Sequence, residues 1–265
     1  MKARWRQYLR RWHPEGIPWP GTILYNAVSR TSIFQKHYQL VADDLAHYCR
    51  SGRVLDIGTG PGWLLLALQR SLPEVDAIGV DISASMVSLA TRNLARVGCR
   101  RPGEVRRAGA DALPFPDDSM DAVVSTGSLH HWKDPVAGLN EAHRVLKPDR
   151  YALLYDLVRK VPPQVSRRSR AEFGVLRTAL LSLHSLEEPF YSAEEMAALA
   201  AGTRFGSGAT RFLGVLCCLV LQKGGLSPAA VDQDIHDRCA GSRAAPRVGT
   251  PGTRPRAHPP WEVAP

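Results

Sequence analysis

The sequence lacks an apolar run long enough to cross a membrane, and it is poor in cysteine. Its longest apolar stretch, residues 213–221, falls well short of the roughly 20 residues that a membrane-spanning helix needs. The basic residues 1–14 have no apolar core of the kind found in secretory signals. The five cysteines form no Cys-x-x-Cys pair, and neighbouring Cys217 and Cys218 would point to opposite faces of a strand. These absences favour a reducing, cytoplasmic compartment, and we expect no metal site.

Acidic residues are scarce in two segments that hold most of the net charge of +9. Residues 1–14 contain five basic residues and no acidic one, and residues 159–177 contain six basic residues against Glu172 alone. A basic excess attracts nucleic acid, anionic membranes or acidic substrates, and it is equally compatible with solvated loops. Hydrophobic residues make up 44% of the 265 residues, which suits one well-buried α/β domain with appendages. We expect no nucleic-acid partner.

Between residues 51 and 225, short apolar stretches alternate with stretches of helical periodicity. Strands are expected at 53–58, 76–81, 104–111, 121–127 and 151–157, with helices at 63–72, 83–98 and 135–146. Gly214 separates two further apolar stretches, 209–214 and 215–223, and predicts a tight antiparallel hairpin. Because strands that alternate with helices form parallel sheets with right-handed crossovers, we expect a doubly wound, Rossmann-like α/β fold. Its sheet would be mostly parallel and seven-stranded, with an antiparallel C-terminal hairpin.

Changes in composition divide the chain into parts. We expect an N-terminal helical lid segment at 1–50, a main domain at 51–225 with an insertion at 158–190, and a disordered tail at 226–265. Outside the alternating region, helices are expected at 31–49, near 170–184 and at 192–202. Ser192 and Glu195 have the spacing of a capping box, which marks the start of the last of these helices.

Three glycines alternate in "VLDIGTGPG", residues 54–62, where an expected strand turns into a helix. Such a turn points backbone N–H groups and a helix N-terminus at a ligand, and glycine allows the close approach and positive φ that this needs. A dinucleotide fingerprint, G-x-G-x-x-G, would place its third glycine at position 63, which is Trp63. No G-x-x-x-x-G-K-[ST] phosphate loop occurs. The loop therefore predicts a nucleotide-type ligand but matches neither of these fingerprints.

Asp81 ends the second expected strand, beside the glycine loop. A carboxylate at this place can accept hydrogen bonds from both hydroxyls of a ribose. Alternatively, Asp81 caps the following helix together with Ser83. The two roles are compatible.

Four motifs, in this order, resemble those of class I S-adenosylmethionine-dependent methyltransferases of the small-molecule, ubiquinone/menaquinone methyltransferase-like type. They are "VLDIGTGPG", "AIGVDISASMVSLA", "GADALPFPDDSMDAVVSTGSLHHWKDP" and "AHRVLKPDRYALLYD". The resemblance covers residues 38–157 closely and 192–223 loosely. It departs at "KPDR", where relatives usually have Lys-Pro-Gly-Gly. It implies S-adenosylmethionine as cofactor and methyl transfer to a small-molecule acceptor.

The resemblance also implies contacts with the cofactor. Asp56 would face the amino group of the methionine moiety, and Asp111 would accept a hydrogen bond from the adenine amino group. Ala112 would donate its N–H to the adenine ring, and Met86 would pack against the adenosine. As alternatives, Asp111 is a simple turn residue and Met86 a plain core residue. The full expected set is Asp56, Gly58, Thr59, Gly60, Gly62, Asp81, Ile82, Met86, Asp111, Ala112 and Thr126.

His130 and His131 follow the fourth expected strand, at the edge of the sheet where such folds bind ligands. A histidine there can accept a proton from the acceptor, if the methylated atom carries one. The alternative is that the pair only shapes the pocket wall, because no partner carboxylate can be identified from the sequence. We name both histidines as candidate catalytic residues.

Several other kinds of methyltransferase lack support. The place after the fourth strand reads Ser-Thr-Gly-Ser rather than the Asn/Asp-Pro-Pro-Tyr of DNA amino-methyltransferases, and no Pro-Cys dipeptide of the cytosine-carbon enzymes occurs. No cluster of acids suggests a metal-dependent O-methyltransferase. A non-catalytic alternative is a methyltransferase-like module that binds the cofactor and acts as a regulator or interaction partner.

Near the N-terminus, Trp5, Tyr8, Leu9 and Trp12 share one face of an expected helix that arginines surround. This helix would pack on the domain as a lid over the site. Alternatively, residues 1–14 would make weak contact with an anionic membrane surface.

Overall fold

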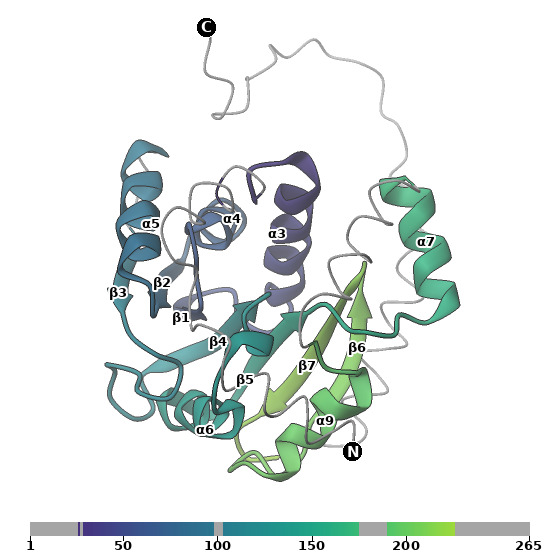
Figure 1. Cartoon of the computed structure of the whole chain (residues 1–265). Coiled ribbons are helices and arrows are strands. Elements are labelled where there is room, and N and C mark those ends of the chain that lie inside the picture. Colours follow the sequence, from purple (N-terminus) through teal and green to yellow (C-terminus); the bar gives the residue numbers. More distant parts are fainter. Residues whose placement is uncertain (1–25, 27–28, 98–102, 175–189, 226–265) are drawn as a thin grey trace, which may run out of the picture. The chain divides into compact units, whose positions relative to one another are not determined.

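The computed structural model describes residues 26, 29–97, 103–174 and 190–225, and these build a seven-stranded sheet (Figure 1). The strand order is β3-β2-β1-β4-β5-β7-β6. The parallel strands are β1 (Gly52–Ile57), β2 (Val75–Asp81), β3 (Glu104–Arg107), β4 (Met120–Thr126) and β5 (Leu146–Asp156). The antiparallel strands are β6 (Ala209–Leu213) and β7 (Leu216–Gln222). The mostly parallel, doubly wound sheet with its C-terminal hairpin is therefore confirmed.

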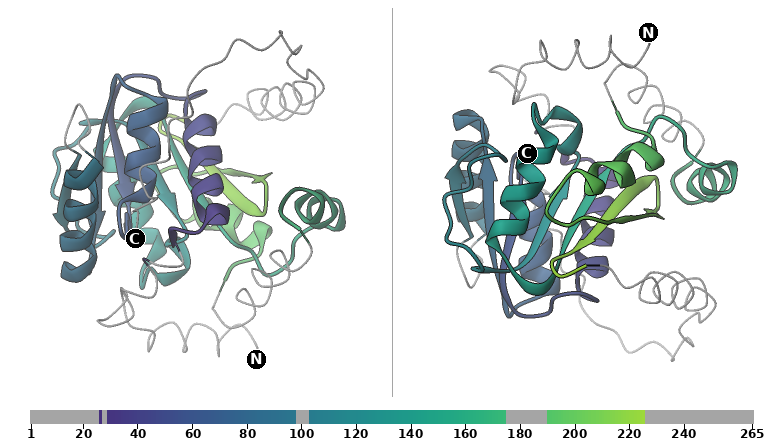
Figure 2. Two further views of the ribbon diagram at one scale, coloured as in Figure 1. Left: turned by 90° about the horizontal axis from the view of Figure 1, so that it is seen from above. Right: turned by 90° about the horizontal axis from the view of Figure 1, so that it is seen from below.

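Helices cover both faces of the sheet, as Figure 2 shows. One face carries α3 (Ser32–Leu45), α4 (Trp63–Ser71) and α5 (Ala84–Val97), and the other carries α6 (Pro135–Val145) and α9 (Ala193–Ala201). Successive residues of a strand point to opposite faces. Accordingly, Val54 packs with the α3–α4 cluster and Leu55 with the α6–α9 cluster. Both faces are covered, which is why these strands read as continuous apolar runs.

The turn into β5 contains the "KPDR" departure. The strand starts at Leu146, earlier than the expected 151, because the chain pairs with Met120 before and Ala122 after an irregularity in the register. Asp149 adopts a φ of 60°, the left-handed region that glycine favours and that Asp tolerates better than most residues. Its amide donates to the Lys223 carbonyl at 2.9 Å. The turn thus forms without the glycines that relatives usually have.

Helix α3 belongs to the core of the domain. Its Val41, Ala42 and Leu45 are fully buried, and its Asp44 accepts hydrogen bonds from Tyr155 on β5 and from Arg211 on β6. A buried charge pair with further hydrogen bonds fixes how a helix sits on its sheet. Residues 32–45 of the expected 1–50 lid segment therefore pack against the sheet.

Other expectations fall wholly or partly outside the described residues. These are the amphipathic N-terminal face, the rest of the segment before residue 26, the insertion beyond 174 and the tail at 226–265. Within the insertion the structure has α7 (Pro163–Phe173), which begins earlier than the helix expected near 170–184. The capping box of Ser192 and Glu195 is present at the start of α9. None of the helices in the described ranges is long and apolar enough to span a membrane.

Candidate active site

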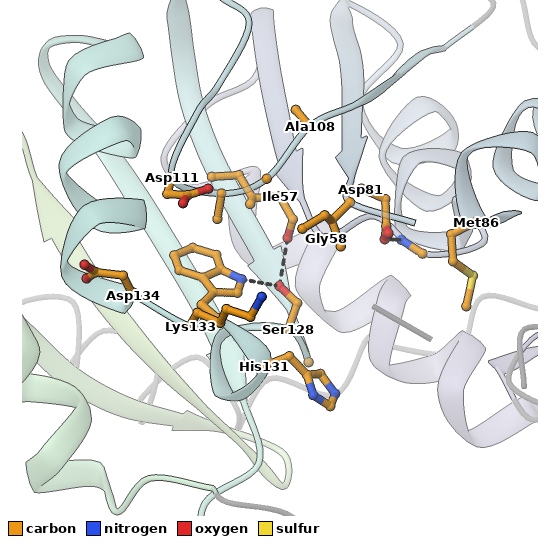
Figure 3. Close-up of a pocket in the computed structure, with 16 residues that line it drawn as sticks. Ile57, Gly58, Asp81, Met86, Ala108, Asp111, Ser128, His131, Lys133 and Asp134 are labelled. Carbon is orange, nitrogen blue, oxygen red and sulfur yellow. Dashed lines mark hydrogen bonds between the residues drawn. The ribbon is translucent and has the colours of Figure 1, made fainter. Parts of the chain in front are cut away.

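A pocket opens at the carboxyl ends of β1, β2 and β4 (Figure 3), where doubly wound sheets bind their ligands. It encloses about 820 Å³ of empty space, a volume that includes its open mouth. It is lined by Ile57, Gly58, Gly60, Asp81, Ile82, Met86, Ala108, Gly109, Ala110, Asp111, Gly127, Ser128, His131, Trp132, Lys133 and Asp134.

The glycine loop is fitted closely to the residues after β4. Gly58 has a φ of 75°, and a Cβ on it would lie 2.4 Å from the Ser128 hydroxyl oxygen. That hydroxyl donates to the Ile57 carbonyl at 3.0 Å and accepts from the Trp132 indole N–H at 3.1 Å (Figure 3). A side chain at position 58 would therefore push apart the loop and the wall that carries Trp132.

Asp81 joins the glycine loop to the start of α5. Its two carboxylate oxygens accept from the backbone N–H groups of Gly60 and Ser83, each at 2.9 Å. Burial raises the pKa of this carboxyl. A carboxylate offers about four acceptor sites, so the two backbone bonds leave capacity for hydroxyl groups of a ligand. The structure thus combines the helix-start role and a place in the pocket wall.

Asp56 lies beneath the loop and does not line the pocket. Its side chain is buried, and burial raises its pKa to about 7, with the nearby Asp81 carboxylate acting in the same direction. A carboxyl without a cationic partner in such a place favours its protonated form.

Because of Asp56, the ligand-free protein should lose stability as the pH rises from 6 to 8. The folded chain keeps a proton that the unfolded chain, with an ordinary pKa of 3.8, has released. This stabilising contribution is full below pH 3.8 and is lost as the pH rises through about 7. The loss between pH 6 and pH 8 is about 1.4 kcal/mol. Urea unfolding at both pH values measures it, and Asp56→Asn should remove this part of the pH dependence. An unchanged pH dependence in Asp56→Asn would contradict the assignment.

Asp111 lines the pocket from the loop after β3, on the side opposite Asp81 (Figure 3). Ala112 does not line it, and its N–H donates to the Gly109 carbonyl at 3.3 Å. The expected donation from Ala112 to a ligand ring would therefore require that bond to open.

A pair of charged residues on α6 holds the loop that carries Asp111. The Arg144 guanidinium donates to the Leu113 and Phe115 carbonyls at 3.0 and 2.8 Å. Glu141 accepts from the Leu113 N–H at 2.9 Å, and its bonds with Arg144 lower its pKa. Together with the burial of Leu113 and Phe115 in the core, this pair helps to set where Asp111 stands.

Arg144→Met should raise the dissociation constant of the nucleotide-type ligand about 3- to 10-fold, since it removes the loop's carbonyl partners and each such bond is worth about 0.5–1.5 kcal/mol. Calorimetric titration measures the change. Arg92→Met, the same substitution on the exposed face of α5, is the control. Equal dissociation constants for Arg144→Met and Arg92→Met would show that the pair of Arg144 and Glu141 does not contribute to ligand binding.

The two histidines after β4 differ in their surroundings. His131 lines the pocket, whereas His130 lies behind it with its side chain 5% exposed. The two rings are in contact and tilted by 43° to each other, with centroids 3.9 Å apart, and the Phe190 ring packs on His130 at 4.2 Å. His130 therefore contacts the pocket through His131.

Asp156, at the end of β5, is the partner carboxylate that the sequence did not identify. It is fully buried and lies 2.9 Å from His130 Nδ1, and it also accepts from the His130 backbone N–H at 3.1 Å. Its cross-strand neighbour is Cys217, whose thiol pKa is raised to about 12 by burial. Asp156 closes an apolar strand, "YALLYD", and an acid in that position is the signal that would have pointed to it.

The structure brings only some of the expected ligand-binding residues to the pocket wall. Those that line it are Gly58, Gly60, Asp81, Ile82, Met86, Asp111 and His131. Those that do not are Asp56, Thr59, Gly62, Ala112, Thr126 and His130. Gly62 instead starts α4, with a φ of 80°, and faces Ala90 of α5. The wall residues that sequence reasoning missed include Ser128, Trp132, Lys133 and Asp134. Among the described residues, no group of three or more His, Cys, Asp or Glu could hold a metal ion.

A family model described as a methyltransferase domain matches residues 54–149. This segment includes most of β1, all of β2 to β4, the glycine loop and the three aspartates of the pocket wall, Asp81, Asp111 and Asp134. Residues 54–149 therefore form a methyltransferase domain.

The relatives agree with this assignment. The methyltransferase domain is 37% identical over 112 residues to a ubiquinone/menaquinone biosynthesis C-methyltransferase, UbiE, of Geobacter sulfurreducens. The match covers 41% of this chain and 43% of that protein, so the chain spans less than half the length of this curated relative. The crystal structure of YcgJ from Bacillus subtilis is 28% identical, with a TM-score of 0.50, over 66% of this chain and 70% of that chain.

A methyltransferase structure from Methanococcus maripaludis, described as putative and S-adenosyl-L-methionine-dependent, has a TM-score of 0.59 at 18% identity. It covers 77% of this chain and 92% of that chain, and it supports the fold alone.

The pocket of the methyltransferase domain fits the family's cofactor, S-adenosylmethionine. Asp81 and Asp111 supply acceptors for hydroxyl and amino groups, and Ile82 and Met86 supply apolar surface. Gly58 has no Cβ, which would collide with Ser128, so the glycine loop can pack directly against the residues after β4. Asp81, Asp111 and the glycine loop would hold the nucleoside part.

Proposed function

We propose that the protein transfers the methyl group of S-adenosylmethionine to a small-molecule acceptor whose nucleophilic atom carries a proton. The observation that supports this most is the position of the histidine pair. His131 stands in the wall of the pocket, and the neighbouring His130 ring, which contacts it, is held by the buried carboxylate of Asp156.

The chemistry needs little from the protein beyond placement and the removal of water, because the methyl group of S-adenosylmethionine is bonded to a positively charged sulfur and is already activated. As the acceptor's lone pair bonds to the methyl carbon, the carbon–sulfur pair stays on sulfur, and the acceptor's proton goes to a histidine nitrogen. No group is oxidised or reduced in this step.

The contact between His130 and Asp156 determines which ring nitrogen is free. When Nδ1 donates its proton to a carboxylate, Nε2 of the neutral ring is left as the acceptor. The same logic orients the histidine of hydrolytic triads. Asp156 is thus a positioning residue for His130, and His131, which lines the pocket, is the candidate proton acceptor that meets the acceptor directly, with His130 behind it as the second candidate.

The acceptor we propose is small and largely apolar. Ile57, Met86 and Trp132 give the pocket an apolar lining beside its few carboxylates. The quinone-related name of the Geobacter relative supports the same class. We also propose a cytoplasmic location, which Cys49 and Cys217 support, because both are buried thiols that form no disulfide among the described residues.

The test is transfer from methyl-labelled S-adenosylmethionine to a panel of phenols, hydroquinones, alcohols and amines, read by mass spectrometry. We expect methylation of at least one hydroxyl compound, together with formation of S-adenosylhomocysteine. Methylation of amines alone would contradict the proton-accepting role of the histidines. Tight cofactor binding with no transfer to any member of the panel would favour the non-catalytic binding module.

A further inference from the structure

The segment just before α3 is joined to the start of α4, next to the glycine loop. Ser29 is fully buried, and its hydroxyl accepts from the Trp63 indole N–H at 3.1 Å and donates to the Asn26 carbonyl at 3.1 Å. Gln35 donates its side-chain amide to the Ser29 carbonyl at 3.0 Å. Ser29 therefore lies in a small group of hydrogen-bonded residues, and Trp63 connects this group to the helix that follows the glycine loop.

Asn93 on α5 makes a second connection to the same segment. Its side-chain amide, buried at 8% exposure, donates to the Pro61 carbonyl at 2.9 Å and to the Asn26 side-chain oxygen at 3.5 Å. Pro61 belongs to the glycine loop itself. Asn93 and Trp63 thus tie the loop and its helix to residues 26 and 29 on the side away from the pocket.

Because glycine restrains the backbone little, the conformation of the loop depends on its hydrogen bonds to neighbouring residues, of which Gly58 and Thr59 each make one to the Val80 carbonyl, at 2.8 and 2.9 Å. Gly58, Gly60 and Gly62 all have a positive φ, and glycine loses more conformational freedom on ordering than any other residue. On the pocket side, Gly60 is held by Asp81. On the opposite side, Pro61 and Trp63 are held by the connections just described.

We propose that Trp63 and Asn93 form a latch that uses Ser29 and Asn26 to hold the glycine loop in its ligand-binding conformation. Both act as positioning residues, since neither lines the pocket. Ser29 and Asn26, which precede α3, thereby influence the affinity for the cofactor. The idea depends on the proposed function only in its choice of S-adenosylmethionine as the probe.

The test uses the full chain with Trp63→Phe, which keeps an aromatic ring but removes the N–H, with Ser29→Ala, which removes the acceptor, and with the double variant. Ser71→Ala is the matched control, because it removes a hydrogen bond of 2.7 Å between Gln39 on α3 and Ser71 at the far end of α4. Asn93→Ala tests the second connection separately.

Two readouts are taken. The first is hydrogen exchange of the loop amides in the ligand-free protein, and the second is the dissociation constant for S-adenosylmethionine from calorimetry. Each latch variant should speed exchange in residues 58–62 and raise the dissociation constant about 3- to 10-fold, as expected for one lost hydrogen bond. Because Ser29→Ala already removes the bond that Trp63→Phe removes, and the bond to the Asn26 carbonyl besides, the double variant should be no worse than Ser29→Ala alone.

Loop exchange and affinity that match those of Ser71→Ala would overturn the latch, and so would effects of Trp63→Phe and Ser29→Ala that multiply in the double variant. A wild-type chain that does not bind S-adenosylmethionine would contradict the proposed function instead, and the exchange readout would still decide on the latch.

Discussion

Asp156→Asn is expected to slow methyl transfer to a hydroxyl acceptor about 10²- to 10⁴-fold, the range that general-base catalysis contributes. Both carboxylate oxygens act as acceptors, Oδ2 from the His130 backbone N–H at 3.1 Å and Oδ1 from the Leu157 N–H at 2.8 Å, with the His130 ring against both, whereas an amide keeps only one acceptor oxygen. Its NH₂ group can also donate to Nδ1, which would favour the wrong tautomer. Affinity for S-adenosylmethionine should change little, because Asp156 does not line the pocket. Single-turnover rates and calorimetry on the same preparation measure the two effects.

The control is Asp121→Asn, the same substitution near the amino end of β4, whereas the pocket lies at the carboxyl ends of the strands. Asp121 accepts from the Arg53 N–H at 2.9 Å and from Lys147 at 2.8 Å, so its loss affects stability but not the site. The Asp156→Asn rate should recover in part at high pH, where the acceptor's hydroxyl ionises without help. A rate that falls no more than in Asp121→Asn would remove Asp156 from the mechanism.

Asp81→Ala should weaken the binding of S-adenosylmethionine about 10- to 150-fold, which corresponds to the roughly 1.5–3 kcal/mol of a hydrogen bond to a charged group. The substitution removes the acceptor in the pocket wall and also frees the N–H groups of Gly60 and Ser83. Calorimetric titration with S-adenosylmethionine and with S-adenosylhomocysteine should show the same loss for both, since Asp81 would contact the nucleoside part that they share.

Asp76→Ala serves as the control for Asp81. Asp76 lies at the other end of the same strand, where it pairs loosely with Arg53 at 3.8 Å. Exposed pairs of this kind contribute about 0–1 kcal/mol to stability, and the pair is remote from the pocket. Affinity in Asp76→Ala should equal that of the wild type. An Asp81→Ala protein that binds as tightly as Asp76→Ala would refute the role given to Asp81.

The sheet could be predicted because its signals are local. Apolar stretches such as 53–58 and 76–81 are bounded by glycine, proline or acidic residues, and the helices between them have a clear period. The start of β5 was missed because it depends on pairing with Met120 and Ala122, which the sequence of the turn does not encode.

The site was predictable only where its residues belong to motifs. Asp81 and the glycine loop follow a strand directly, so their meeting is built into the local pattern. The hydrogen bond between His130 and Asp156 joins the residues after β4 to the end of β5, and it depends on the register of these two strands. Similarly, Ser128 reaches Ile57 across the gap between β1 and β4. Such contacts are non-local, which is why the sequence left the question of a base open.

The most direct test of the account is a calorimetric titration of the full chain with S-adenosylmethionine, run in parallel with NAD. The glycine loop lacks the third glycine of a dinucleotide site, and Trp63 stands in its place. The account predicts saturable one-to-one binding of S-adenosylmethionine that Asp81→Ala weakens, and no heat of binding with NAD. Binding of NAD with S-adenosylmethionine ignored would contradict it.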